Sequence, residues 1–162
     1  MTYILVDLSN TFYRARHAIQ GNADLKLGMA FHITFHSIKK AWQDFNGKHV
    51  VVCLEGRSWR KDFYEPYKRN RAETRAAMTI KEEEEEKLFW EAFDQFKTFI
   101  IEKTNCTVLH HPRLEADDLI AGFIQQHPNA KHVIISNGSD FQQLISENVS
   151  QYNGVDDVHI TN

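Results

Sequence analysis

The chain has few of the residues that mark secreted, fibrous or disordered proteins. Its 162 residues include only two cysteines, three prolines and seven glycines. Two cysteines without a metal-type spacing exclude a disulfide scaffold, and we expect both to be buried free thiols in a reducing cytoplasm. There is no apolar run of the length that a signal peptide or a membrane-spanning helix needs. The composition therefore predicts one globular domain over residues 1–162.

The chain also lacks a net positive charge, although its cations are concentrated in one segment. The formal net charge is −3, so the overall charge does not indicate a nucleic-acid partner. Residues 57–81 nevertheless hold eight cations with four aromatic residues among them. The cations are Arg57, Arg60, Lys61, Lys68, Arg69, Arg71, Arg75 and Lys81, and the aromatic residues are Trp59, Phe63, Tyr64 and Tyr67. A solvated surface segment is the alternative, but cations with stacking rings favour contact with a phosphate backbone and its bases.

Apolar residues recur in a pattern that predicts an α/β fold with a mostly parallel central sheet and helices on both faces. Short continuous apolar runs indicate buried parallel strands, and a spacing of three and four indicates helices. The predicted strands are 3–8, 49–54, 106–109 and 132–136, followed by a closing pair at 149–152 and 158–160. The predicted long helices are 27–46 and 80–103, and shorter ones follow residues 9 and 115 and begin near residue 141.

Carboxylates follow the predicted strands and begin one predicted helix. Asp7 and Glu55 lie at the ends of predicted strands, and Asp140 lies four residues past Ser136. Glu115, Asp117 and Asp118 fall in the first turn of a helix. The acids in the helix turn could simply be residues that the helix dipole stabilises, which is the alternative to a functional site. The carboxyl ends of parallel strands line one crevice, however, so six carboxylates would meet there and repel one another. A bound Mg²⁺ or Mn²⁺ ion would relieve this repulsion. An acidic crevice together with the basic, aromatic segment predicts hydrolysis of phosphodiesters by metal-activated water.

Five motifs, in this order, give the chain a resemblance to a known family. They are Val6-Asp7-Leu8-Ser9-Asn10, Glu55-Gly56 with Arg60, Tyr67-Lys68-Arg69-Asn70-Arg71, Glu115-Ala116-Asp117-Asp118, and Ser136 with Asp140-Phe141 and Leu144. The sequence resembles the N-terminal, PIN-like nuclease domain of the 5′-nucleases and flap endonucleases, in particular the phage-type 5′-3′ exonucleases. The motifs cover almost the whole chain.

The resemblance implies a Mg²⁺-dependent 5′-3′ exonuclease and flap endonuclease, with Mn²⁺ as a substitute, acting on DNA or RNA–DNA with 5′ ends or flaps in replication. It implies a cytoplasmic protein, or one in the host cytoplasm if phage-encoded, with a basic helical arch. It implies that Asp7, Glu55, Glu115, Asp117, Asp118 and Asp140 bind or support metal, with Asp7 and Asp118 also catalytic. It implies that Lys68 steadies the scissile phosphate, and that Arg14, Arg60, Tyr67, Arg69, Arg71 and Arg75 contact DNA.

Three departures from the family pattern bear on activity. The family usually has Asp where this chain has Glu55, and an acid where it has Gly138. The family also continues into a C-terminal helix-three-turn-helix domain, which we expect to be absent here or supplied by a partner chain. A fragment, half of a split protein and an impaired enzyme are all consistent with these departures.

Two other classes of function stay open at this point. One is a non-catalytic or partner-dependent DNA-binding module of the same fold, which Gly138 favours. The other is an unrelated α/β domain such as a receiver-type phosphoacceptor, which uses an acidic crevice with one Mg²⁺ but does not need the basic segment.

Overall fold

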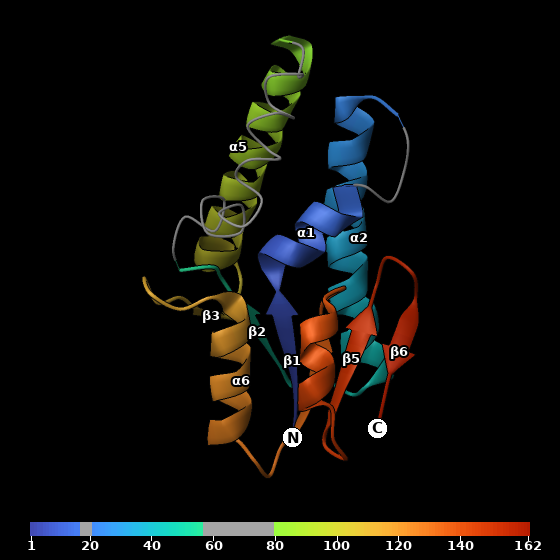
Figure 1. Cartoon of the computed structure of the whole chain (residues 1–162), viewed down its shortest axis with the longest axis vertical. Coiled ribbons are helices and arrows are strands. Elements are labelled where there is room, and N and C mark those ends of the chain that lie inside the picture. Colours follow the sequence, from blue (N-terminus) through green and yellow to red (C-terminus); the bar gives the residue numbers. More distant parts are fainter. Residues whose placement is uncertain (17–20, 57–79) are drawn as a thin grey trace.

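The computed structural model describes residues 1–16, 21–56 and 80–162, and places them around one six-stranded sheet (Figure 1). The strands are β1 (Thr2–Asp7), β2 (His49–Cys53), β3 (Thr107–Leu109), β4 (Lys131–Ile135), β5 (Val149–Asn153) and β6 (Val158–Ile160). The helices are α1 (Leu8–Arg16), α2 (Ala23–Asp44), α5 (Ile80–Lys103), α6 (Ala116–Gln126) and the 3₁₀ helix η1 (Ser139–Leu144).

The sheet is parallel except at one edge. Its order is β3-β2-β1-β4-β5-β6, and only β6 runs antiparallel to its neighbour. β2 and β3 lie on one side of β1, and the later strands lie on the other side, so the strand order reverses at β1. In open parallel sheets the carboxyl ends of the strands at such a switch are the usual place for a ligand site.

Side chains alternate along the central strands and bury both faces of the sheet. Ile4 and Val6 of β1 pack with α1, α2 and α5, whereas Leu5 packs with α6 and η1. Burial on both faces explains why the strands are continuous apolar runs instead of alternating ones. Figure 1 shows α6 on one side of the sheet and α2 and α5 on the other, with α1 at the carboxyl end of β1.

The predicted α/β class and parallel sheet are confirmed, with small differences at element ends. Helix α5 has the predicted bounds. Helix α2 begins at Ala23, earlier than predicted, because the side chain of Asn22 caps it by accepting the Leu25 N–H at 2.8 Å. Cys53 is a buried free thiol as expected, whereas Cys106 is only partly buried. None of the helices in the described ranges is long and apolar enough to cross a membrane.

Candidate functional site

Asp7 is the buried centre of the candidate site. It is the last residue of β1 and is 3% exposed. Its Oδ2 accepts a hydrogen bond from Ser136 Oγ at 3.3 Å, and the backbone N–H of Asn10 donates to the carboxylate. Its Oδ1 is buried without any partner among the described residues. A buried carboxylate oxygen with no donor is costly, so this oxygen is suited to a cation.

Glu55 and Gly56 each form a hydrogen bond with the segment that begins α6. Glu55 Oε2 accepts the Ala116 N–H at 3.3 Å, and the Gly56 N–H donates to the Leu114 carbonyl at 2.9 Å. A Cβ at position 56 would lie 1.6 Å from the His111 carbonyl oxygen, which is a backbone atom that a side-chain rotation cannot move. Glycine is therefore required for the chain after β2 to approach the segment that leads into α6.

The three acids at the start of α6 have different surroundings. Glu115 and Asp118 form a capping box, in which Asp118 Oδ2 accepts the Glu115 N–H at 3.1 Å. Asp117 is partly buried, whereas Glu115 and Asp118 are exposed. Glu115 and Asp118 therefore support the start of α6, and their predicted role in metal binding stays a prediction. Of the three acids, only Asp117 acts on the buried Asp7 with a repulsion strong enough to raise its pKa.

A polar network holds the segment after β4 beside Asp7. Ser136 Oγ lies 3.3 Å from Asp7 Oδ2 and 3.2 Å from Asn10 Oδ1, so its one proton can serve either acceptor. Asn10 Oδ1 also accepts the Asn137 N–H at 3.1 Å. Asn10 and Ser136 were part of the recognised motifs but had no assigned role. The signal that could have indicated Ser136 is a small polar residue at the end of an otherwise apolar strand.

Burial and mutual repulsion raise the pKa values of the carboxyl groups at this edge. Burial, reinforced by Glu55 and Asp117, raises the pKa of Asp7 well above its usual range. Burial raises the pKa of Glu55 to about 7, against the opposing hydrogen bond from Ala116. Burial also raises the pKa of Asp117, with further contributions from Asp140 and Asp118. Glu115 and Asp118 add to the repulsion on Glu55, although both also belong to the capping box. We call the other four acids, Asp7, Glu55, Asp117 and Asp140, the coupled carboxylates.

The coupled carboxylates suit a divalent metal ion in their chemistry. All are hard oxygen donors, which Mg²⁺ and Mn²⁺ prefer, and Asp7 Oδ1 has no hydrogen-bond partner within the described part of the chain. Over residues 1–16, 21–56 and 80–162, however, no three acidic, histidine or cysteine side chains lie close enough together to hold one ion by themselves. Mg²⁺ usually keeps several waters, so it needs only one or two direct carboxylates. Which of the six predicted acids bind metal stays a prediction.

The two arginines of α1 differ in their surroundings. Arg14 is exposed, as a residue that contacts DNA must be. Arg16 lies 2.8 Å from Glu86 and 4.4 Å from the centre of the Phe89 ring, so it fastens α1 to α5. The remaining predicted DNA-contacting residues lie outside the described part of the chain. They are Arg60, Tyr67, Lys68, Arg69, Arg71 and Arg75.

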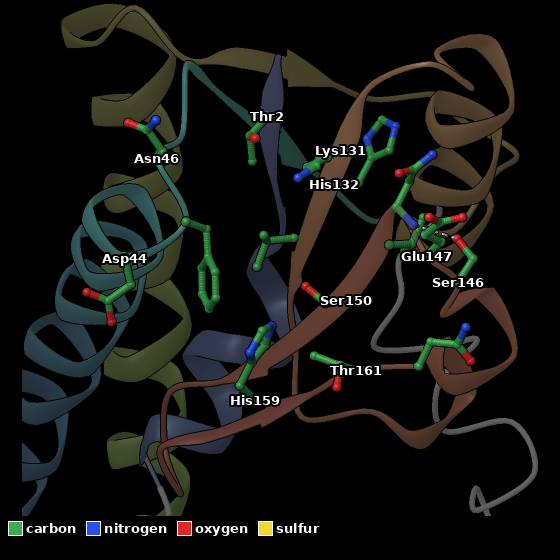
Figure 2. Close-up of a pocket in the computed structure, with 15 residues that line it drawn as sticks. Thr2, Asp44, Asn46, Lys131, His132, Ser146, Glu147, Ser150, His159 and Thr161 are labelled. Carbon is green, nitrogen blue, oxygen red and sulfur yellow. Dashed lines mark hydrogen bonds between the residues drawn. The ribbon is translucent and has the colours of Figure 1, made fainter.

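A cavity of about 610 Å³, with a mixed polar and apolar lining, lies where the strands of the sheet begin. Its lining includes the first residues of β1, β4 and β5, namely Thr2, Lys131 and Val149, and the end of α2. Figure 2 shows its polar side chains spread around the rim from separate elements. The coupled carboxylates come from the other ends of the strands, so the cavity is not part of the candidate site.

Asp7→Asn is expected to stabilise the metal-free protein at pH 8 by roughly 1–3 kcal/mol, because the neutral amide removes a buried negative charge and its repulsion with Glu55 and Asp117. The folded-state pKa of Asp7 is raised, so the folded protein binds this proton more tightly than the unfolded chain. The Asp7 carboxyl therefore lowers stability as pH rises from its unfolded value through its folded value. Urea unfolding in EDTA at pH 8 and at pH 4 measures this difference.

The same urea measurement has a matched control. Glu147→Gln also removes one negative charge, but from an exposed side chain between η1 and β5. It should change stability by less than about 0.5 kcal/mol at either pH. Equal effects of the two variants, or a stabilisation by Asp7→Asn that does not shrink on acidification, would contradict the prediction.

The fold and the coupled carboxylates together define an α/β domain with an acidic site at the carboxyl edge of a parallel sheet. The family model described as "5'-3' exonuclease, N-terminal resolvase-like domain" matches residues 2–162. The chain belongs to this family, as the sequence motifs indicated, and the receiver-type alternative has no support.

Curated relatives and solved structures agree with this family. The chain is 29% identical over 120 residues to the flap endonuclease Xni of Pseudoalteromonas translucida, covering 72% of this chain and 42% of that protein. It is 29% identical over 132 residues to the ribonuclease H of Enterobacteria phage T4, covering 74% and 41%. The chain thus spans less than half the length of these two relatives. Both relatives are nucleases by name.

The structural comparison supports the same fold. The bacteriophage T5 5′-exonuclease with bound zinc ions matches with a TM-score of 0.72 and 20% identity, over 99% of this chain and 58% of that one. The T5 D15 flap endonuclease in a complex with DNA and metal ions matches with a TM-score of 0.68. At this identity the likeness establishes the fold alone.

Proposed function

We propose that this chain is a metal-dependent 5′-3′ exonuclease and flap endonuclease domain that hydrolyses phosphodiesters in DNA or RNA–DNA. The observation that carries the proposal is Asp7. It is a buried carboxylate with one oxygen unpartnered, electrostatically coupled to Glu55 and Asp117 from two other elements. Structural ion pairing does not explain this arrangement, because no cation among the described residues neutralises it.

Two parts of the site have separate roles in the proposed reaction. When bound, Mg²⁺ or Mn²⁺ supplies an activated water and neutralises charge on the scissile phosphate. The ion would be held directly by one or two of Asp7, Glu55 and Asp117, with water completing its shell and the other coupled carboxylates acting on it through that water. Ser136 and Asn10 hold Asp7 in place, and the capping box of Glu115 and Asp118 fixes the first turn of α6, which carries Asp117.

The DNA strand is proposed to be held by the basic residues. Arg14 is exposed on α1, the helix that begins directly after Asp7. Lys68 would contact the scissile phosphate, and Tyr67, Arg69 and Arg71 would contact the strand. Support for these four comes from the sequence, through the resemblance and the local excess of positive charge.

Cleavage of a 5′-labelled flap DNA with Mg²⁺ or Mn²⁺, and its loss in EDTA, tests the proposal. Asp117→Asn should lower cleavage about 10- to 100-fold, the usual cost of altering the surroundings of a catalytic metal. Asp156→Asn is the matched control, because Asp156 is exposed in the turn between β5 and β6. In a second arm, the triple alanine variant of Lys68, Arg69 and Arg71 should reduce the salt dependence of DNA binding by up to ~3 units of log–log slope.

The two arms separate the two parts of the proposal. No cleavage by the parent chain with either ion would overturn the enzymatic function. An unchanged salt slope in the triple variant would show that these cations form only a solvated surface.

A further inference from the structure

Gln151 is a buried amide whose only described partners are in the segment after β4. It lies in the middle of β5 and is 2% exposed. Its Nε2 donates to the Ser136 carbonyl at 2.9 Å and to the Gly138 carbonyl at 2.8 Å. Two carbonyl oxygens require donors, so the amide nitrogen must face them, because the reversed amide would place oxygen against oxygen.

The sheet itself does not need this side chain. β5 is already paired with β4 along four residues, from His132 with Val149 to Ile135 with Tyr152. The Gln151 Oε1 has no partner among the described residues, which is a cost that an apolar side chain would avoid. Beyond the strand pairing, the amide holds the carbonyl groups of Ser136 and Gly138, which lie outside β4, in place.

Those two carbonyls belong to the segment that completes the candidate site. Ser136 Oγ contacts Asp7 and also accepts the Gly138 N–H at 3.0 Å, and Asp140 lies two residues beyond Gly138. Asn10 holds this segment from the side of α1 through the Asn137 N–H. Gln151 holds it from the side of β5. The segment is therefore fixed between two neighbouring elements, and Gln151 is the residue among these that no motif includes.

We propose that Gln151 is a positioning residue for the acids of the candidate site, an inference that rests on the proposed nuclease function. By holding the Ser136 and Gly138 carbonyls, it keeps the Ser136 hydroxyl beside Asp7 and keeps Asp140 in the range from which it acts on Asp117. Gln151 does not contact the reacting atoms. It acts through the backbone of residues 136–138.

The variant Gln151→Met tests the proposal, because methionine has a similar length and flexibility but donates no hydrogen bond. The control is Tyr152→Phe on the same strand, which removes the 2.8 Å bond from Tyr152 to Asp157 and leaves residues 136–138 untouched. Flap cleavage and amide hydrogen exchange of residues 137–140 are measured for both, well below the unfolding temperature.

Gln151→Met should lower kcat about tenfold or more with KM nearly unchanged, because displaced catalytic groups affect the transition state more than substrate binding. Exchange at residues 137–140 should rise about tenfold. Tyr152→Phe should change neither quantity. If Gln151→Met fails to fold, the same measurements on Gln151→Leu, which is also apolar and donates no hydrogen bond, decide the matter.

The outcomes distinguish this proposal from the proposed function. Unchanged kcat, whatever the exchange at residues 137–140, would overturn the role of Gln151 while the nuclease function stands. If the parent chain does not cleave at all, the nuclease function fails, and Mn²⁺ affinity by calorimetry replaces kcat. A loss of about fivefold or more in Gln151→Met then supports the positioning role, and equal affinity overturns it.

Discussion

Gly56→Ala is expected to reduce flap cleavage by about 100-fold, the scale associated with a displacement of roughly 1 Å in a catalytic site. The new Cβ would lie 1.6 Å from the His111 carbonyl oxygen and 2.5 Å from that of Leu114, so the two backbone segments must separate. Separation breaks the 2.9 Å bond from Gly56 to Leu114 and pulls Glu55 away from the Ala116 N–H. Glu55 and Asp117 would then be too far apart to act on the same bound metal ion.

Overpacking of this kind should also cost about 1–3 kcal/mol of stability, so cleavage is measured at a temperature where circular dichroism shows both proteins folded. Gly122→Ala is the matched control. Gly122 lies in α6, and a Cβ there has no neighbour within 4 Å. This variant should leave cleavage unchanged and raise stability by about 0.5–1 kcal/mol, because alanine favours a helix over glycine. Parent-level cleavage by folded Gly56→Ala would show that the contact with residues 111–114 does not set the site.

Gly138→Asp is expected to tighten Mn²⁺ binding by about tenfold, equivalent to ~1.4 kcal/mol. The backbone of Gly138 has φ −73° and ψ 140°, which any residue can adopt. A Cβ there would lie 3.4 Å from Ser136 Oγ, an ordinary contact, and that hydroxyl lies 3.3 Å from Asp7 Oδ2. A carboxylate at position 138 would thus enter the same neighbourhood as the coupled carboxylates and give a bound ion one more oxygen ligand.

Calorimetric titration with Mn²⁺ compares Gly138→Asp with Gly138→Asn, which has the same shape without the charge. Flap cleavage is measured in parallel and should increase if a poorly held ion limits the reaction. Equal Mn²⁺ affinity in the parent and Gly138→Asp would mean that position 138 does not face the metal. Tighter binding without faster cleavage would assign the main limit on activity to something other than this missing acid.

The sequence by itself determined the class of fold and the chemistry of the site. Continuous apolar runs predicted the parallel strands, because only strands covered on both faces lack polar alternation. The same runs indicated where Asp7 and Glu55 fall, since Asp7 ends one buried strand and Glu55 lies just past the end of another. The carboxyl ends of parallel strands share one edge, so the nearness of acids far apart in the sequence could be inferred without coordinates. The family resemblance rested on the same residues and was confirmed.

Only the tertiary structure decided how the acids and their supports are arranged. Sequence spacing could not separate Asp117 from Asp118, because both lie in the first turn of α6, yet only Asp118 accepts the N–H of the capping residue. The spacing also could not show that Arg14 is exposed whereas Arg16 forms an ion pair with Glu86, which lies on a different helix. Gln151 and Gly56 depend on backbone atoms that are distant in the chain. Such contacts arise from how layers pack, and local patterns carry no information about them.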